Sequence, residues 1–173
     1  MGRNSVKENK NIYQRSREAL GLTREKAEEL LQGLTAERIE KIENERSGAH
    51  PDEVLLMAEG YKVPELCNYY CANECPIGRR YVPPVETKDL SRIVLEMLAS
   101  LNKMQHHQEK LIAITADGAI SGSELDDFVT IQQELEKISL SVESLQLWAE
   151  KKMADGSIDP KEYKRTQESL KKQ

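Results

Sequence analysis

Three cysteines occur in this chain at regular spacing. Cys67, Cys71 and Cys75 stand four residues apart in the stretch ELCNYYCANECPIG, so on a helix they share one face. Such thiols could hold a metal or an iron–sulfur cluster, sense oxidants, or pack as small apolar groups. Structural zinc sites and iron–sulfur clusters usually take four ligands, and no fourth lies close in sequence. We expect packing and no cofactor, with a metal or cluster, or redox sensing, as the alternatives.

Two other patterns resemble metal sites but are incomplete: a repeated segment similar to half of a calcium loop, and a pair of adjacent histidines. Residues 116–124 and 154–162 resemble each other and the second half of an EF-hand calcium loop, but the first halves lack the acidic residues. Calcium needs six to eight oxygen ligands, so we interpret both segments as connectors between helices. The adjacent His106 and His107 cannot share one helix face. The sequence has no Gly-rich phosphate loop, HExxH motif or recognisable Ser/His/Asp set, and we expect no enzyme.

A third set of polar residues lies in the segment 36–46, AERIEKIENER. On a helix, Ile39 and Ile42 fix a buried side. The opposite side is polar, with Glu37, Lys41 and Asn44 at its centre, Glu40 beside them and Arg38 on its flank. Arg, Lys and Asn read the edges of guanine and adenine, and Glu accepts from cytosine. This side could therefore read DNA, although its glutamates repel phosphate.

Short helical patterns separated by turn signals surround this segment and predict an all-α fold. Gly21 and Gly33 end the first two helices, Thr23 and Thr35 cap the second and third, and Asp52 caps the fourth. A fifth helix opens at Val63-Pro64. On the first helix, Ile12, Ala19 and Leu20 share one face. The expected inward positions of the next three helices are Ala27, Leu30, Leu31, Ile39, Ile42, Val54, Leu55, Met57 and Ala58, and the fifth helix has Leu66 and Tyr70 as apolar anchors.

These elements resemble the xenobiotic-response-element (XRE) family of helix-turn-helix repressors, which have the lambda-repressor-like fold. The matching residues are Gly21-Leu22-Thr23, Gly33-Leu34-Thr35, the run from Ile39 to Asn44, and Pro51 to Ala58, with one extra residue between Thr23 and Ile39. The resemblance covers about residues 11–78. It implies a five-helix domain whose third helix enters the major groove of double-stranded DNA.

The resemblance also implies which residues contact DNA. They are Arg24, Thr35, Ala36, Glu37, Arg38, Lys41 and Asn44. Arg15, Arg17 and Lys26 could add positive charge, and the N-termini of the second and third helices could hold phosphates. The expected function is a sequence-specific transcriptional regulator. The formal net charge of −5 gives no basic footprint, so the alternative is a protein-interaction or thiol- or metal-sensing scaffold that keeps this fold without binding DNA.

The region from residue 87 to 173 has much longer helical periods. It follows an extended linker at 79–86, which contains Pro83-Pro84. Apolar residues alternate by three and four along two stripes: Leu90, Val94, Met97, Leu101, Met104, Gln108, Leu111 and Thr115; then Phe128, Ile131, Leu135, Ile138, Val142, Leu145 and Ala149. Further apolar positions widen these faces, namely Ile93, Leu98, Ile112, Leu140, Leu147 and Trp148. This pattern is typical of coiled-coil packing.

The short connection at residues 117–120 predicts that these two helices fold back as an antiparallel hairpin. A third helix is expected at about 160–171. We expect this region to form a homodimer, with a monomeric three-helix bundle as the alternative.

The sequence contains no apolar run of the roughly 18 residues that span a membrane, and residues 1–10 are polar. We expect a disordered N-terminus at 1–10, a cytoplasmic location and no membrane partner.

Overall fold

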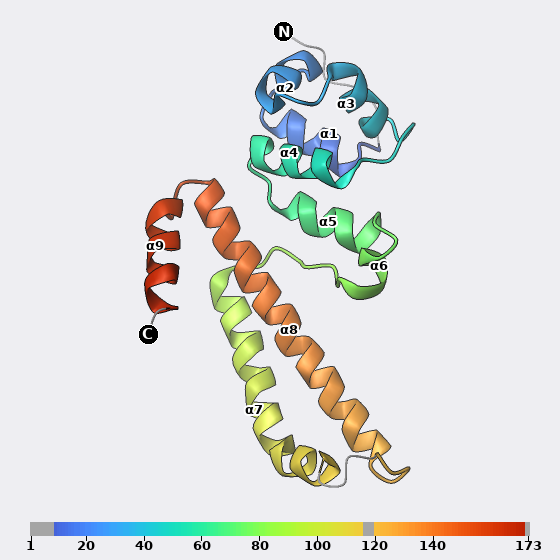
Figure 1. Cartoon of the computed structure of the whole chain (residues 1–173), viewed down its shortest axis with the longest axis vertical. Coiled ribbons are helices and arrows are strands. Elements are labelled where there is room, and N and C mark those ends of the chain that lie inside the picture. Colours follow the sequence, from blue (N-terminus) through green and yellow to red (C-terminus); the bar gives the residue numbers. More distant parts are fainter. Residues whose placement is uncertain (1–8, 116–119, 172–173) are drawn as a thin grey trace. The chain divides into compact units, whose positions relative to one another are not determined.

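The computed structural model describes residues 9–115 and 120–171, and all the regular secondary structure in them is α-helical (Figure 1). The all-α class predicted from the sequence is therefore confirmed. The expected disordered N-terminus and the expected connection at 117–120 lie outside the described residues at 1–8 and 117–119.

The chain divides into two compact units. The first comprises Met1–Pro84 together with Ala149–Gln173, and the second comprises Val85–Trp148. The C-terminal segment thus belongs with the N-terminal helices and not with the rest of the region after residue 87.

The first unit contains short helices joined by tight turns. They are α1 (Ile12–Ala19), α2 (Arg24–Leu31), α3 (Ala36–Glu43), α4 (Pro51–Tyr61), α5 (Glu65–Asn73), α6 (Gly78–Tyr81) and α9 (Pro160–Leu170), with the last turns of α8. Helix α2 packs on α3 and α4, α1 packs on α3 and α4, and α4 packs on α5. The segment 79–86, expected to be a linker, begins within α6 and has no regular secondary structure from Val82 onward.

Local signals in the sequence explain where these helices begin. The hydroxyl oxygens of Thr23 and Thr35 accept the backbone N–H groups of Lys26 and Arg38, so both predicted caps are confirmed. The positive φ of Gly21, +67°, ends α1 in a backbone conformation that favours glycine.

The predicted cap of the fourth helix, Asp52, is wrong by two residues. Helix α4 begins at Pro51, because proline suits the first helical position, where its missing N–H is not needed. His50 is therefore the capping residue, and the carboxylate of Glu53 accepts its backbone N–H at 2.7 Å.

The core of the first unit lies under α3 and α4. Most of the predicted inward residues are buried there, namely Ala27, Leu31, Ile39, Ile42, Val54, Met57, Ala58 and Leu66. Leu30 and Leu55 were predicted to be inside but are about half exposed. Tyr13 and Tyr61 are buried instead, and these large rings fill space that the smaller aliphatic side chains would leave.

The second unit contains two long helices, α7 (Leu90–Thr115) and α8 (Leu125–Ala154), of which α8 belongs to this unit as far as Trp148. The two helices lie side by side (Figure 1). Lys103 pairs with Glu134 at 3.8 Å and Lys110 with Asp127 at 2.6 Å. Since the residue number rises along α7 as it falls along α8, the helices run in opposite directions.

The buried side of α7 matches the predicted apolar stripe only in part, since Met97, Met104 and Leu111 of that stripe are half-buried. Ile93, Ser100 and Ile114 are buried, with spacings of seven and fourteen residues, while Leu90 and Leu101 of the predicted stripe are 38% and 42% exposed. On α8, the buried residues are Ile131, Glu134, Ser141, Ser144 and Leu147, and Glu134 pairs with Lys103 of α7. Small polar side chains allow two helices to approach closely, and a search for apolar positions alone does not find them.

We expect Ile39→Ala to lower the free energy of unfolding of the first unit by about 2–5 kcal/mol, because it removes a fully buried side chain from α3. Ile77→Ala is the matched control: Ile77 is 72% exposed, and we expect a change within about 0.5 kcal/mol. Urea denaturation followed by circular dichroism measures both. Equal losses of unfolding free energy in the two variants would contradict the placement of Ile39 in the core.

Candidate nucleic-acid interface

Helix α3 presents an exposed polar side. Ile39, Ile42 and Glu43 are buried beneath it, whereas Thr35, Glu37 and Lys41 are exposed and Ala36 and Asn44 are half-buried. Five of the residues predicted to contact DNA therefore lie together along the outer side of α3 and at its N-terminus.

The charges on this outer side neutralise one another. Lys41 pairs with Glu37, with Nζ 2.8 Å from Oε1, and this hydrogen bond lowers the pKa of the Glu37 carboxyl. The Asn44 amide donates to Glu40 at 3.3 Å, and the Arg46 guanidinium lies 3.9 Å from the same carboxylate. Exposed pairs of this kind contribute only about 0–1 kcal/mol each, so a ligand could displace them at little cost.

Arg38, a sixth predicted contact, is held within the protein. Its guanidinium forms a two-point bond with the Glu53 carboxylate, at 2.6 and 2.7 Å, and donates to the Ser47 hydroxyl and the Gly48 carbonyl. Burial raises the pKa of Glu53, but the bonds from Arg38 and from the His50 backbone N–H together outweigh it, and the net pKa is lowered. Arg38 therefore fixes the loop between α3 and α4 instead of extending from the outer side.

Arg24, the seventh, takes part in a network around a buried carboxylate. Glu43 is 1% exposed. Arg17 binds it at two points, 2.6 and 3.0 Å, and Arg24 binds it at 2.9 Å. Arg17 also donates to the Leu22 carbonyl. Arg17, expected to add positive charge at the surface, is thus buried, and Arg24 is partly exposed at the start of α2.

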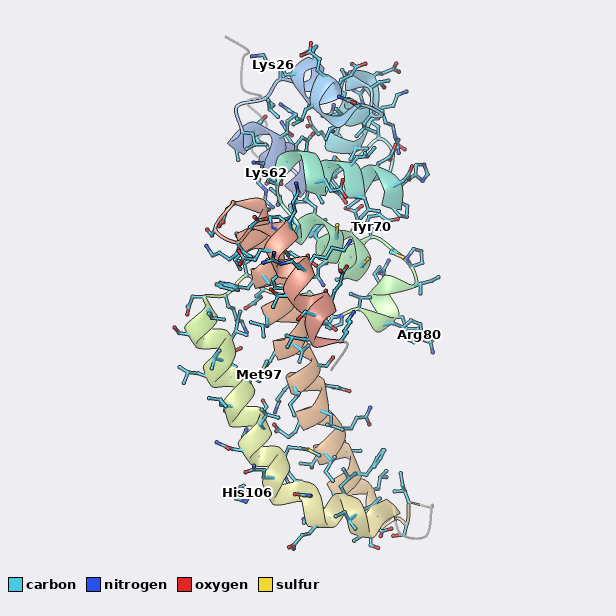
Figure 2. All side chains as sticks on the ribbon, turned by 60° about the vertical axis from the view of Figure 1, so that its left-hand side comes forward. Lys26, Lys62, Tyr70, Arg80, Met97 and His106 are labelled. Carbon is cyan, nitrogen blue, oxygen red and sulfur yellow. The ribbon has the colours of Figure 1, made fainter. Side chains whose placement is uncertain are left out.

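The N-terminus of α3 already binds an acidic side chain. The Glu28 carboxylate of α2 accepts the backbone N–H of Ala36 at 2.9 Å, which is one of the groups that could have held a phosphate. Sequence analysis missed Glu28, because its bond joins residues on two different helices. Lys26, labelled in Figure 2, and Arg15 remain exposed, and neither forms an ion pair with another residue of the described chain.

The three cysteines all lie on α5 or directly after it and are half-buried. Cys67 packs against the core, and burial, together with the nearby Glu150 carboxylate, raises the pKa of its thiol. The Cys75 sulfur accepts the Gly78 N–H. Gly78 lies so close to Cys71 that an added Cβ would be 2.1 Å from its carbonyl oxygen. Cys71 and Cys75 therefore lie at a tight turn from α5 into α6, whereas Cys67 packs against the core.

Within the described ranges, no group of three or more His, Cys, Asp or Glu side chains is placed to hold a metal ion. In the same ranges, no helix is both long enough and apolar enough to cross a membrane.

No known protein family, no curated protein and no solved structure matches this chain. Its own residues and their geometry therefore carry the functional argument.

We expect Glu43→Ala to lower the free energy of unfolding by about 3–5 kcal/mol, because it leaves the Arg17 guanidinium buried without its carboxylate. Glu37→Ala removes a carboxylate from an exposed pair and serves as the control, with a loss below about 1 kcal/mol. Replacing both partners, Arg17→Met with Glu43→Leu, should restore much of the loss. Urea denaturation measures all three, and a double variant no better than Glu43→Ala would contradict the pairing.

Proposed function

We propose that residues 11–78 form an XRE-type, lambda-repressor-like helix-turn-helix domain, and that the chain is a sequence-specific DNA-binding transcriptional regulator. The observation that carries the proposal is the placement of α3. It is an eight-residue helix that follows α2 after a short turn, packs on α1 and α2, and leaves one whole polar side in solvent. A helix presented in this way fits the major groove.

Lys41 and Asn44 are the residues proposed to read bases, because their donors match guanine and adenine edges. Ala36 offers a methyl group to thymine, Glu37 can accept from the cytosine amino group, and Thr35 can donate to a phosphate. On binding DNA, the Lys41 ammonium would break its ion pair with Glu37 in order to contact a base.

Few cations are available for phosphates, because Arg17, Arg24 and Arg38 bind carboxylates of the protein. Affinity that does not depend on sequence comes mainly from the neutralisation of phosphates. Non-specific binding by this protein should therefore be weak and its salt dependence shallow, so that base contacts supply most of the discrimination.

We also propose that α7 and α8 form an antiparallel hairpin that associates with a second copy. Leu90, Val94 and Leu101 remain exposed on a side of α7 that is distinct from the α8 seam. A groove of about 300 Å³ along this side is lined by Leu101, Met104, Gln105, Gln108 and Leu111. Heptad stripes of this kind usually pack against another helix, and a two-fold dimer suits a regulator that reads two half-sites.

A second candidate function is a protein-interaction module that keeps this fold without binding DNA. The observation that favours it is the bond from Glu28 to the start of α3, together with the pairing of Lys41 and Arg46 to acidic residues. An acidic side chain at the helix N-terminus repels phosphate, whereas a neutral polar surface of this type is common in protein contacts. A sensing role for the cysteines would belong to this candidate.

DNA binding is tested by selecting sequences from random duplexes and titrating the best one in a mobility-shift assay at low salt. We expect Lys41→Ala and Asn44→Ala each to weaken binding by roughly 5- to 150-fold, the loss of one good base contact, about 1–3 kcal/mol. Lys164→Ala, an exposed change on α9, is the control and should bind like the parent chain. The absence of saturable binding at micromolar protein would exclude the regulator and leave the second candidate.

Dimerisation is tested by light scattering on the full chain. We expect Leu101→Glu to convert the dimer into a monomer, because it places a charge in the apolar stripe of α7. Leu95→Glu is the control: Leu95 is exposed on another side of α7, and its substitution should leave the dimer intact. Helix content by circular dichroism should be unchanged in both. A monomeric parent chain would contradict the proposal.

A further inference from the structure

The first unit contains a hollow that DNA reading does not use. Its volume is about 780 Å³, within the range of roughly 300–1,000 Å³ typical of small-molecule sites. It lies where the turn from α4 to α5 faces the last turns of α8 and the turn that follows them. The apolar part of its lining comprises Leu55, Ala58, Pro64, Cys67, Met153 and Ala154.

Short-range contacts fix the shape of both walls. On one side, Lys62 takes a left-handed conformation with φ of 59°, which ends α4 and turns the chain toward α5. On the other side, the Asp155 carboxylate accepts the Ser157 N–H at 2.9 Å within the turn after α8. An ion pair between Lys151 and Glu65, at 2.6 Å, joins the end of α8 to the start of α5. The hollow is therefore formed before any ligand arrives.

The charged groups around the hollow are mainly acidic. Among the described residues that line it, Glu59, Glu150 and Asp155 are acidic and Lys62 is basic. Neither Glu59 nor Glu150 forms an ion pair with any residue in the described part of the chain. Hydrogen bonds from Ser157 and Lys152 lower the pKa of Asp155 to about 2, so this carboxylate is ionised at neutral pH.

We propose that this hollow binds a small organic cation with an apolar body. The aliphatic and sulfur-containing walls favour an apolar body, because its transfer from water is favourable. The excess of carboxylates favours a positive charge and opposes an anion of the same size. Glu59 and Glu150, which pair with no cation among the described residues, are the groups that select the charge. The proposal stands independently of DNA binding.

The test compares two probe ions of nearly the same shape and opposite charge. Tetraphenylphosphonium and tetraphenylborate are titrated into the full chain by isothermal calorimetry. We expect tetraphenylphosphonium to saturate one site per chain, and tetraphenylborate to show no saturable binding. Equal binding of both ions, or no binding of either, would overturn the proposal; the latter result would be expected if a protein segment covers the hollow.

Charge variants then locate the binding. We expect Glu59→Gln and Glu150→Gln each to weaken tetraphenylphosphonium binding by roughly three- to tenfold, the effect of one nearby charge in a partly solvated site. Lys62→Gln, the matched loss of a positive charge, should strengthen binding or leave it unchanged. Lys161→Gln, on α9 outside the lining, should have no effect. If Glu59→Gln and Glu150→Gln bound the phosphonium as well as the parent chain, the site would lie elsewhere and the proposal would fail.

A steric variant provides a second readout. We expect Ala154→Trp to fill the hollow and abolish phosphonium binding, and circular dichroism shows whether the variant is folded. Glu59, Glu150 and Lys62 are exposed, so we expect their variants to fold. They therefore test the proposal even if Ala154→Trp does not fold.

Discussion

The buried carboxylate of Glu43 is the group on which the arrangement of the first unit depends. A helix of only eight residues is marginal on its own, so its orientation must come from its contacts. Ile39 and Ile42 supply apolar burial, which has little directionality. Glu43 adds direction, because an ionised carboxylate away from water costs several kcal/mol unless its oxygens are paired. Arg17 from α1 and Arg24 from α2 bind both oxygens only when the three helices take their observed positions.

The same arrangement determines the character of the surface. Arginines that would have made this unit basic are bound to carboxylates of the protein: Arg17 and Arg24 to Glu43, and Arg38 to Glu53. These arginines fix the positions of the helices and are therefore not free to bind phosphates. What remains on α3 is a nearly neutral set of hydrogen-bonding side chains. Such a surface can discriminate between ligands by the geometry of its donors and acceptors, but attracts polyanions only weakly over a distance.

The sequence predicted the features that depend on neighbouring residues. The two threonine caps, the glycine that ends α1 and the burial of Ile39 and Ile42 follow from local backbone chemistry and from the helical period. Bonds between helices were not predictable in this way. Arg38 meets Glu53 across 15 residues and Glu28 meets Ala36 across 8, and no short-range rule selects these partners from the many charged residues of the chain. The sequence therefore placed the exposed polar side of α3 correctly, but it assigned Arg38 and Arg24 to that side without knowledge of their partners. That this side reads DNA stays a prediction.

The seam between α7 and α8 shows why a count of apolar residues predicts only part of the contact. Besides Ile93 and Ile131, the seam contains buried polar side chains such as Ser100 and Glu134. Two buried polar atoms, His107 Nδ1 and Glu134 Oε2, have no hydrogen-bond partner among the described residues. Each unsatisfied atom costs about 1–3 kcal/mol, so this seam gains less stability than a wholly apolar one would. A polar seam favours one register over its neighbours, because shifting the helices would place these groups against aliphatic side chains. The more strongly apolar stripe of α7, which includes Leu90, Val94 and Leu101, is then available for association. If the hairpin had formed along that stripe instead, the serines and His107 would face solvent and little apolar surface would remain for a partner.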